Sequence, residues 1–372
     1  MIKILFLIHD LGQGGAEKVL VNLVNNMDPF KFDIHVTALF GGGVNEQFLK
    51  PHIHYHYIWP KAIPGNSWLM KLLTPKQLHK LCVHETFDIE VSYLEGVSAR
   101  IISGGVPACK HLVTWIHGEQ HTHKAAAGAF RSLKEAKWCY NQFQKIVCVA
   151  ETVKTDFCTL FPAISSCDVL YNTVESDRIL SMAEDPAPEF SDNKIRLIAV
   201  GSLKPVKAFD RLLRITNRLI EEKYNVHLYI LGRGPLEKQF HEYIKQNSLT
   251  SNITLLGYQT NPYKYVAKAD LFLCSSHSEG FSTAATEALI LGVPVCTVEV
   301  SGMKEMLGSN NEYGVITENS ENSLYLGIKR LLDDPNLLAA YRKNAKKRGK
   351  CFDTKHTVEA TEKMFERILS DK

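Results

Sequence analysis

The sequence has no long hydrophobic run and no cysteine spacing that marks a disulfide or zinc framework. No apolar stretch approaches the roughly 20 residues that a membrane-spanning helix needs, so we expect a protein that is soluble or peripheral to a membrane. The nine cysteines are an odd number without a Cys-x-x-Cys pair, which favours reduced core thiols over disulfides or metal ligands. The apolar run in the opening MIKILFLIHD is too short to form the core of a signal peptide. It predicts a buried first strand and a cytoplasmic location, with the cytoplasmic face of the membrane as the alternative place.

Strong net charge is also missing. The formal net charge is +3, which is too small to argue for a nucleic acid partner. One basic cluster, RKNAKKRGK at residues 342–350, is typical of a solvated helix face, with contact to an anionic surface as the alternative. The hydrophobic content of 45% is that of an ordinary globular protein.

Short apolar runs alternate with amphipathic ones along the chain. Strand-like runs such as IKILFLI and DIEVSY stand in the first half, and the rhythm restarts at IRLIAVG, with helical stretches such as DRLLRITNRLIEE between strands. This alternation predicts parallel sheets covered by helices on both faces. Because 372 residues exceed the roughly 100 to 200 of a usual domain, we predict two doubly wound, Rossmann-like α/β domains.

The boundary between the domains is predicted near Asn172, before a polar, proline-containing stretch at residues 181–194. The first domain is then residues 1–172 and the second is residues 173–352. Ligands of such sheets bind beyond the carboxyl ends of the strands, and two domains that face each other would form a cleft there. The loops that follow strands should therefore carry the chemistry.

The loop after the first strand is rich in glycine. Gly12, Gly14 and Gly15 precede a helix whose first turn holds Glu17, and such a turn lets the backbone approach a ligand closely. It is not a dinucleotide fingerprint, because the Gly-x-Gly-x-x-Gly spacing would need glycine at position 17. The loop either contacts a ligand or is simply a tight turn.

Two further loops follow strands in the second half. In GSLKPVKAFDRLL, Lys207 stands at the start of a helix, where the helix dipole disfavours a cation. A phosphate would explain it, whereas the alternative is an exposed lysine on a surface turn. In GRGPLEKQF, two glycines precede a proline at a helix start, which leaves room for a ligand but is weak evidence alone.

The stretch HSEGFSTAATEALILGVPV carries two glutamates with seven residues between them. Glu279 is expected in a loop, residues 280–283 in the first helical turn, and Glu287 one to two turns into the helix. Carboxylates accept from hydroxyls and a helix N-terminus holds an anion, so the pattern suits a nucleoside diphosphate sugar. The alternative is a capping carboxylate followed by a solvent-facing helix glutamate.

Together with GGAEKVL, VGSLKPVKAF, ILGRGP, GVPV and YNTVES, the segment EGFSTAATEAL resembles the retaining glycosyltransferases of the group 1 type, family four, which have the GT-B fold. The motifs stand in the family's order and cover nearly the whole chain. The resemblance implies transfer of a sugar from a nucleoside diphosphate sugar, with UDP-sugar favoured, to a glycan or polyprenol-linked acceptor, for cell-surface polysaccharide synthesis. It also implies that the last segment, about residues 353–372, returns as a helix onto the first domain.

The resemblance implies roles for matching residues. Lys207 would bind the donor diphosphate, Glu279 the sugar hydroxyls and Glu287 the ribose, while His117 in TWIHGE would lie near the transferred sugar. The expected catalytic residues are Glu279, His117 and Lys207. The expected donor-binding residues are Gly14, Gly15, Ser202, Lys207, Gly232, Arg233, Glu279, Gly280, Phe281, Ser282, Thr283 and Glu287.

One position departs from the family. An arginine often follows the glycine of the family's VGRL motif, and here that residue is Ser202. Diphosphate binding would then depend on Lys207 and the helix dipole, with Arg211 or Arg233 as substitutes.

The resemblance also implies the course of the reaction. The anomeric configuration is retained, the acceptor attacks on the face from which the diphosphate departs, and the leaving phosphate assists in deprotonating the acceptor. Lys207 and a helix N-terminus can neutralise the leaving group, and no Asp-x-Asp motif stands in a loop, so we expect neither a metal nor a cofactor. A glycosidase-like pair of carboxylates is not evident, so no enzymic nucleophile is assigned.

The resemblance also implies that the first domain binds the acceptor, and this domain holds eleven of the fifteen histidines. Residues 67–81 predict a short amphipathic helix interrupted by Pro75, which suits contact with a membrane that bears the acceptor; ordinary packing is the alternative. Its apolar and basic residues are Trp68, Leu69, Leu72, Leu73, Lys71, Lys76 and Lys80.

Three other functions are open to such a chain. A nucleotide-sugar epimerase would share the fold and the donor, but would isomerise the donor without an acceptor. A nicotinamide dehydrogenase would need the fingerprint that position 17 interrupts. A non-catalytic nucleotide-sugar sensor would bind the donor without turnover.

Overall fold

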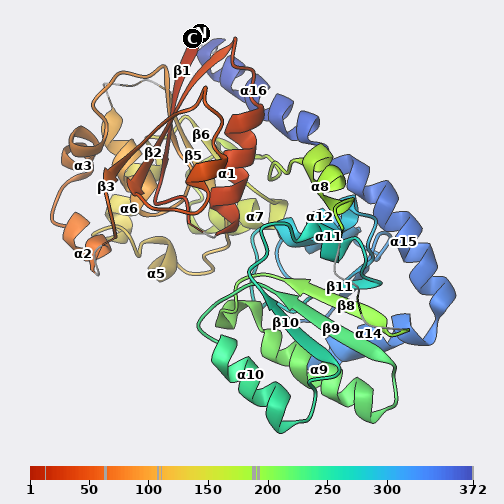
Figure 1. Ribbon diagram of the computed structural model, residues 1–372. Coiled ribbons are helices and arrows are strands. Elements are labelled where there is room, and N and C mark those ends of the chain that lie inside the picture. Colours follow the sequence, from red (N-terminus) through yellow and green to blue (C-terminus); the bar gives the residue numbers. More distant parts are fainter. Residues whose placement is uncertain are drawn as a thin grey trace. The chain divides into compact units, whose positions relative to one another are not determined.

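The structure is a computed structural model that describes residues 1–12, 14–62, 65–106, 109, 111–186, 190 and 193–370 (Figure 1). The chain divides into two compact units, one of Met1–Val174 with Thr354–Lys372 and one of Glu175–Asp353. The chain thus passes from the first unit to the second close to Asn172. The polar stretch at 181–194 is not the junction, because helix α8 (Ser176–Ala183) and strand β8 (Ile195–Val200) both belong to the second unit. Residues 187–189 and 191–192 of that stretch, and residues 371–372 at the end, lie outside the described residues.

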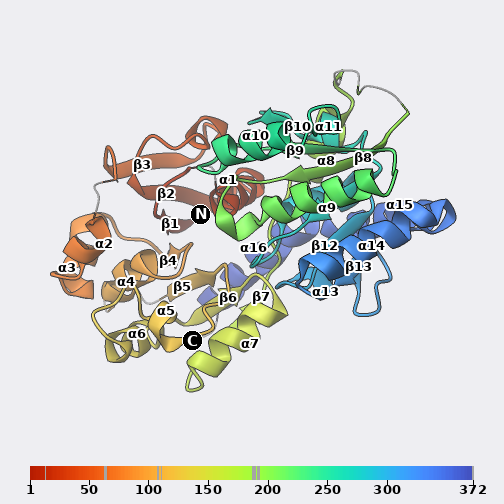
Figure 2. The same cartoon turned by 90° about the horizontal axis from the view of Figure 1, so that it is seen from below.

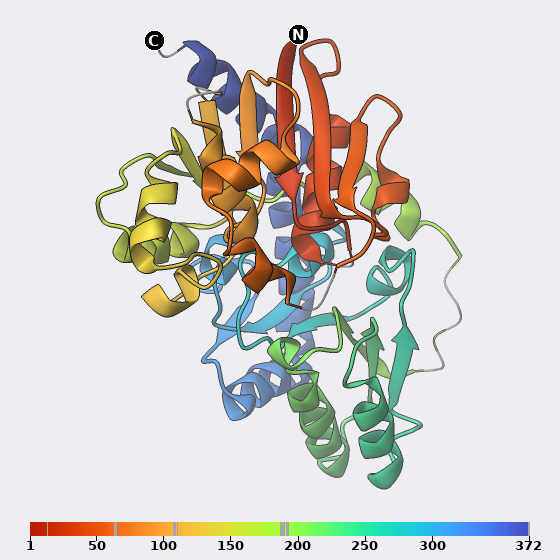
Figure 3. The ribbon, with the colours of Figure 1, turned by 90° about the vertical axis from the view of Figure 1, so that its left-hand side faces the viewer.

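The first unit contains a sheet of seven parallel strands in the order β3-β2-β1-β4-β5-β6-β7. Figure 3 shows the neighbouring strands β1 and β2, in red to orange, pointing the same way. The strands are β1 (Ile2–Ile8), β2 (Phe32–Phe40), β3 (His54–Trp59), β4 (Ile89–Ser92), β5 (His111–Ile116), β6 (Lys145–Cys148) and β7 (Cys167–Val169). The central strand β1 is largely apolar, and both β1 and β4 are buried along most of their length, because helices cover both faces of a parallel sheet.

The helices of the first unit are α1 (Gly15–Asn26), α2 (Asn66–Met70), α3 (Pro75–Cys82), α4 (Val97–Ile102), α5 (His123–Ala126), α6 (Leu133–Tyr140), α7 (Glu151–Leu160) and α16 (Thr354–Ser370), with short 3-10 turns at Glu46–Phe48 and Ser103–Gly105. Helix α16, at the end of the chain, lies beside α1 (Figure 1). Phe365 of α16 is fully buried, and its ring lies 6.0 Å from that of Phe6 in β1 and 6.1 Å from that of Trp115 in β5. The last helix thereby completes the core of the first unit.

The second unit contains six parallel strands in the order β10-β9-β8-β11-β12-β13. The strands after β8 are β9 (Val226–Leu231), β10 (Ile253–Gly257), β11 (Leu271–Cys274), β12 (Val295–Val298) and β13 (Val315–Thr317). The helices after α8 are α9 (Phe209–Glu221), α10 (Glu237–Gln246), α11 (Tyr263–Val266), α12 (Thr283–Ile290), α13 (Met303–Leu307), α14 (Glu321–Asp333) and α15 (Pro335–Gly349), with 3-10 turns η3 (Pro205–Lys207) and η4 (Lys350–Phe352).

Helices α9 and α14 lie side by side against this sheet (Figure 2). Helix α9 buries Leu212, Ile215 and Leu219, which recur every three or four residues and so form one apolar face. That face packs into a core with β8 and β9. In each sheet the strand order reverses beside the first strand, between β1 and β4 and between β8 and β11. The loops at those reversals are where ligands of such folds bind.

All nine cysteines are free, and seven of them are buried, as expected of core thiols. None of the helices in the described ranges is both long enough and apolar enough to cross a membrane.

Candidate active site

The loops that follow β8 and β11 bring Lys207 and Glu279 together. The Nζ of Lys207 lies 2.6 Å from the Oε1 of Glu279, although 72 residues separate them in the sequence. The hydroxyl of Ser276 donates to the same oxygen at 2.6 Å. The Glu279 side chain is only 10% exposed and that of Lys207 is 25% exposed, so water screens the pair weakly. The two predicted residues therefore form one charged centre at the strand reversal.

The position of Lys207 differs from the prediction. It ends the 3-10 turn η3 and precedes α9, and Ala208 between them adopts a left-handed conformation with φ of 48°. The anion that compensates Lys207 is the carboxylate of Glu279. A ligand phosphate would share this lysine with a carboxylate that is already in place.

Backbone and side-chain hydrogen bonds fix the two loops to each other. The hydroxyl of Ser275 donates to the carbonyl of Lys207 at 2.9 Å, and the backbone N–H of His277 donates to the carbonyl of Val206 at 2.8 Å. Because these bonds join the loops directly, the Lys207–Glu279 pair is held in position before a ligand binds.

Of the two arginines proposed to replace the family's arginine, one is occupied and one is free. Arg211 donates to the amide oxygen of Asn319 at 2.7 Å and lies 3.0 Å from the Nδ1 of His277. Arg233 is exposed at the end of β9, and its guanidinium has no hydrogen bond or ion pair with the described residues. The hydroxyl of Ser202 likewise has no hydrogen-bond partner among them. Of these two arginines, Arg233 is therefore the one available to an incoming anion.

Gly232 allows the loops after β8 and β9 to touch. Its φ of 137° is rarely open to other residues, and a Cβ atom there would lie 1.9 Å from the carbonyl oxygen of Gly201. The backbone conformation and the close approach of Gly201 therefore require glycine at position 232.

Helix α12 starts later than predicted. Its first residue is Thr283 and its N-cap is Ser282, whose hydroxyl accepts from the N–H of Ala285. Gly280 and Phe281 precede the helix, and the Phe281 ring is buried 6.0 Å from the ring of Phe352. Serine is a strong N-cap, which explains why the first turn begins after it. The N–H groups of Thr283 and Ala284 have no acceptor among the described residues, so the helix offers two free donors.

Glu287 lies inside the second unit. It is 6% exposed, and one of its carboxylate oxygens lies 3.3 Å from the hydroxyl of Tyr263. The alternative of a capping carboxylate with a solvent-facing glutamate is wrong on both points, because Ser282 is the cap and Glu287 is buried.

In the first unit, Gly14 and Gly15 lie at the start of α1. Gly14 is the N-cap, and a Cβ atom on it would lie 1.9 Å from a carboxylate oxygen of Glu17. The preceding turn is closed by Asp10, which accepts from the N–H of Gly12 at 2.7 Å. Asp10 and Gly12 thus form a tight turn.

His117 follows β5 and packs against the ring of Tyr93, with 5.1 Å between the ring centroids. Burial lowers the pKa of His117 from 6.5 to about 4, partly offset by a hydrogen bond to the backbone of Tyr93. Its buried Nε2 has no hydrogen-bond partner among the described residues. A buried imidazole nitrogen without a partner is costly in the absence of a ligand, which supports its place in a site.

Sequence reasoning missed Glu95. Its carboxylate accepts from the backbone N–H of His117 at 2.9 Å, and burial raises its pKa. A glutamate in the loop directly after β4, at the strand reversal, was the available signal.

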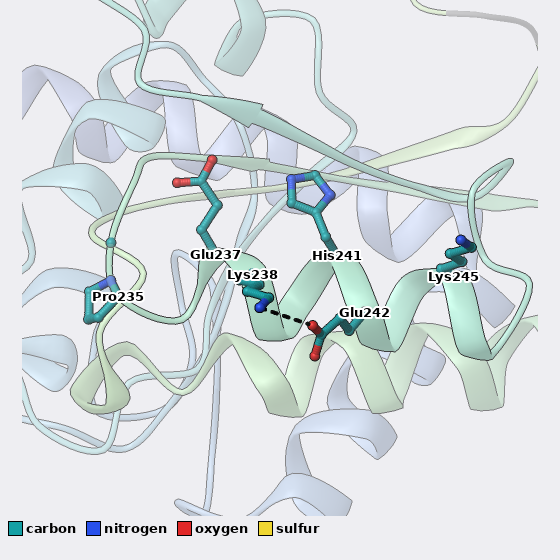
Figure 4. Close-up of a pocket in the computed structure, with 7 residues that line it drawn as sticks. Pro235, Glu237, Lys238, His241, Glu242 and Lys245 are labelled. Carbon is teal, nitrogen blue, oxygen red and sulfur yellow. Dashed lines mark ion pairs between the residues drawn. The ribbon is translucent and has the colours of Figure 1, made fainter.

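A surface hollow of about 590 Å³ lies along α10 (Figure 4). Its lining residues are Gly234, Pro235, Glu237, Lys238, His241, Glu242 and Lys245. None of the residues expected to bind a donor lines it, and an ion pair joins two of its lining residues, Lys238 and Glu242. The hollow is therefore separate from the Lys207–Glu279 centre.

Comparison with known proteins agrees with this arrangement. Residues 182–348 match the family model "Glycosyl transferases group 1", and residues 13–178 match "Glycosyltransferase Family 4". A Campylobacter jejuni protein is 30% identical over 361 residues, which are 95% of this chain and 96% of that protein. It is named N-acetylgalactosamine-N,N'-diacetylbacillosaminyl-diphospho-undecaprenol 4-alpha-N-acetylgalactosaminyltransferase. The lipopolysaccharide core biosynthesis glycosyltransferase LpsD of Rhizobium meliloti is 22% identical over 89% of this chain and 88% of its own length.

Solved structures share the fold. The Anabaena protein Alr3699/HepE, crystallised with UDP-glucose, superposes with a TM-score of 0.77 at 18% identity, covering 99% of this chain and 100% of that chain. WaaG, a glycosyltransferase involved in lipopolysaccharide biosynthesis, superposes with a TM-score of 0.73 at 15% identity, covering 97% of this chain and 99% of that chain. The predicted two-domain α/β fold of the GT-B type is thereby confirmed.

Proposed function

This chain belongs to the group 1 glycosyltransferases, and we propose that it moves a sugar from a nucleoside diphosphate sugar, with UDP favoured, to a polyprenol-linked or other glycan acceptor. The Lys207–Glu279 pair beside the free N-terminus of α12 carries the proposal, because it combines a cation, a carboxylate and free N–H donors at a strand reversal. These are the groups that a diphosphate and a sugar need. The epimerase alternative finds no support in the relatives named above, which are transferases.

The donor diphosphate is proposed to bind between Lys207, Arg233 and the N–H groups of Thr283 and Ala284. The helix dipole adds to these charges at the first turn of α12. Because Ser202 brings no charge, Arg233 is the second cation in this proposal. Gly14 and Gly15 are proposed to approach the donor with their backbone.

The sugar and the ribose are assigned to the two glutamates. Lys207 and Ser276 occupy one oxygen of Glu279, and its Oε2 has no hydrogen-bond donor among the described residues. We assign this oxygen to the sugar hydroxyls. Glu287, with Tyr263 beside it, is assigned to the ribose hydroxyls.

The proposed reaction retains the configuration at the anomeric carbon. The bond from that carbon to the diphosphate breaks, and the negative charge that develops on the leaving oxygen is stabilised by Lys207 and by the α12 N-terminus. The acceptor hydroxyl forms its bond on the same face and passes its proton to the departing phosphate. His117, neutral near pH 7 because of its lowered pKa, orients the sugar by hydrogen bonding. No step is assigned to a metal ion or a cofactor.

The acceptor is proposed to be bound by the first unit and to be linked to a lipid, as in the name of the Campylobacter jejuni relative. Trp68 of α2 and Leu72 just after it are 66% and 63% exposed, and Lys71, Lys76 and Lys80 stand in the same segment. We propose that this segment contacts the cytoplasmic face of an anionic membrane.

The experiment that tests this function begins with melting temperatures in the presence of UDP-, GDP-, dTDP- and ADP-linked sugars, because a ligand of the folded state raises the melting temperature. The donor found in this way is then used for transfer assays and calorimetry with Glu279→Gln and Glu287→Gln. Each substitution removes a charged acceptor worth roughly 1.5 to 3 kcal/mol.

The two variants are expected to differ. Glu287→Gln weakens the free nucleotide and the full donor alike, whereas Glu279→Gln spares the nucleotide and reduces donor binding and transfer. Glu242→Gln, on the outer side of α10, is the matched control and retains both. Normal transfer by Glu279→Gln and Glu287→Gln would falsify the site, and conversion of the donor to an isomer without an acceptor would favour the epimerase.

A further inference from the structure

Two histidines and an aspartate gather at the amino-terminal edge of the first sheet. Asp33 and His35 are the second and fourth residues of β2, and His54 is the first residue of β3. Side chains two residues apart in a strand share a face, and the register pairs His35 with His54. All three side chains therefore stand on one face of the sheet. The loops of the candidate active site follow the opposite, carboxyl ends of the strands.

The distances from Asp33 to the two histidines match the spacing of metal ligands. The Oδ1 of Asp33 lies 3.4 Å from the Nε2 of His35 and 3.3 Å from the Nε2 of His54. These distances are longer than good hydrogen bonds, which lie at about 2.7 to 3.2 Å. They match the edge of a tetrahedron with metal–ligand bonds of about 2.0 to 2.1 Å, which is roughly 3.3 Å. One ligand atom from each of the three residues lies within 4.8 Å of the others. We propose that Asp33, His35 and His54 bind a divalent transition metal ion of the zinc type.

The donor atoms select the class of metal. Two imidazole nitrogens and one carboxylate oxygen suit Zn²⁺, Ni²⁺ or Cu²⁺, whereas Mg²⁺ and Ca²⁺ prefer oxygen ligands alone. Three protein ligands leave the fourth position to water. The His54 side chain is 63% exposed, so an ion reaches the site directly from solvent.

Neighbouring groups hold His35 in place and balance the local charge. The ring of His35 stacks on that of His54 with 4.6 Å between centroids, and Phe87 packs edge-on at 5.2 Å. Lys3 is the nearby cation that would oppose metal binding, but its Nζ is paired with Glu85 at 2.6 Å. His56 is not a fourth ligand, because its Nε2 lies 3.0 Å from the hydroxyl of Thr37. The cluster therefore offers three ligands, and the nearby positive charge of Lys3 is balanced by Glu85.

A metal at this position would join the edge strand to the body of the sheet. Strand β3 is the outermost strand, and His54, His56 and Tyr57 in it are exposed. An ion held by His54 on β3 and by two residues of β2 cross-links the strands and stabilises only the folded state. The proposed role is thus structural, and it does not depend on the proposed function.

The test uses the full-length protein after removal of metal with a chelator. Cobalt(II) is titrated first, because its visible absorption gains intensity in four-coordinate sites and a near-ultraviolet thiolate band reports cysteine ligation. Zinc is then titrated by calorimetry, and the melting temperature is measured with and without zinc. The variants are Asp33→Asn and His54→Ala, with the exposed His123→Ala as the control. His35 is left unchanged, because it packs against Phe87.

We expect one metal equivalent without a thiolate band, and a melting temperature that rises with zinc. Asp33→Asn and His54→Ala should each weaken binding by roughly tenfold or more and abolish the rise, since the first replaces a carboxylate by a neutral, weaker ligand and the second removes a ligand. His123→Ala should behave as the natural protein. Absence of saturable binding, a thiolate band, or unchanged affinity in both ligand variants would overturn the proposal.

Discussion

At the scale of single residues, the groups that a charged side chain already contacts decide whether it is available to a ligand. Lys207 is compensated by Glu279. Arg211 is held by Asn319 and His277, whereas the side chain of Arg233 has no hydrogen bond or ion pair within the part of the chain that the structure describes. An anion that enters here meets one shared lysine and one unshared arginine, and this is why Arg233 and not Arg211 enters the proposed donor site.

His117 makes the stability of the protein depend on pH. Its pKa is lowered from 6.5 to about 4 in the folded state, so between these values the unfolded chain binds more protons than the folded one. Stability contributed by this residue is therefore present above about pH 6.5 and falls as the pH falls toward 4. We expect His117→Gln to lose less stability than the natural protein between about pH 7 and about pH 5, as measured by denaturant midpoints.

Glu95 acts in the opposite direction, because its raised pKa makes its contribution fall as the pH rises. It accepts from the backbone N–H of His117, which the substitution keeps, so the comparison isolates the imidazole. The exposed His356 replaced by glutamine is the control and should leave the profile unchanged. If stability depends on pH in the same way in His117→Gln and in the natural protein, then burial does not lower the pKa of His117 and water reaches its ring.

At the scale of elements, the segment at residues 67–81 is two helices and not one interrupted helix. Helix α2 ends at Met70, and Pro75 opens α3 instead of breaking it, since Thr74 and Gln77 form a capping box in front of it. Proline is favoured at a first helical position, where its missing N–H costs nothing. The exposed Trp68 and Leu72 consequently lie in and just after a short helix of their own.

If this segment contacts a membrane, the double variant Trp68→Ser with Leu72→Ser should bind vesicles containing phosphatidylglycerol roughly tenfold more weakly, because apolar burial is lost. Cosedimentation with vesicles measures this, and the melting shift produced by the donor should stay unchanged. Phe30→Ser with Leu326→Ser removes two exposed apolar residues elsewhere and serves as the control. Equal binding by the two double variants would leave ordinary packing as the explanation.

The loops after β8 and β9 depend on Gly232. Replacement by alanine combines a disfavoured φ with a Cβ 1.9 Å from the Gly201 carbonyl, so we expect a loss of roughly 2 to 4 kcal/mol in the free energy of unfolding. Gly257→Ala is the matched comparison, because its φ of 65° is left-handed but its nearest neighbour is a side-chain atom at 3.7 Å. It should cost about 1 to 2 kcal/mol. Chemical denaturation of both variants measures the difference, and equal losses would show that the Gly201 loop can move away.

At the scale of the whole molecule, the end of the chain belongs to the unit with which the chain begins. Phe365 of α16 is buried against Phe6 and Trp115, and Glu362 accepts from the backbone N–H of Asp28 at 2.7 Å. A chain that stopped after Asp353 would leave this apolar surface uncovered. The core of the first unit therefore needs both the first strand and helix α16.

We expect Phe365→Ala to destabilise the first unit by roughly 3 to 5 kcal/mol, because it removes a large buried ring. Phe30, which is 89% exposed in the same unit, should tolerate the same substitution within about 0.5 kcal/mol. Hydrogen exchange of the β1 and β5 amides assigns the loss to the first unit. Protection that stays unchanged in those strands would mean that α16 is dispensable for this core.

The sequence by itself determined the elements and the candidate loops. Apolar runs of strand length alternate with amphipathic ones, and this predicts two parallel sheets because the pattern is encoded within a few neighbouring residues. For the same reason it placed Lys207 and Glu279 after strands. The start of α12 was predicted too early, because the Ser282 hydroxyl caps the helix and the first turn begins only after this residue.

Only the tertiary structure decided which side chains meet. The Lys207–Glu279 pair and the contact of Glu95 with His117 join residues from separate loops, and the cluster of Asp33, His35 and His54 exists only through the register of β2 and β3. Local patterns of apolar and polar residues do not specify which strands become neighbours or how they align. That choice comes from packing two whole sheets under their helices, which is a property of the complete chain.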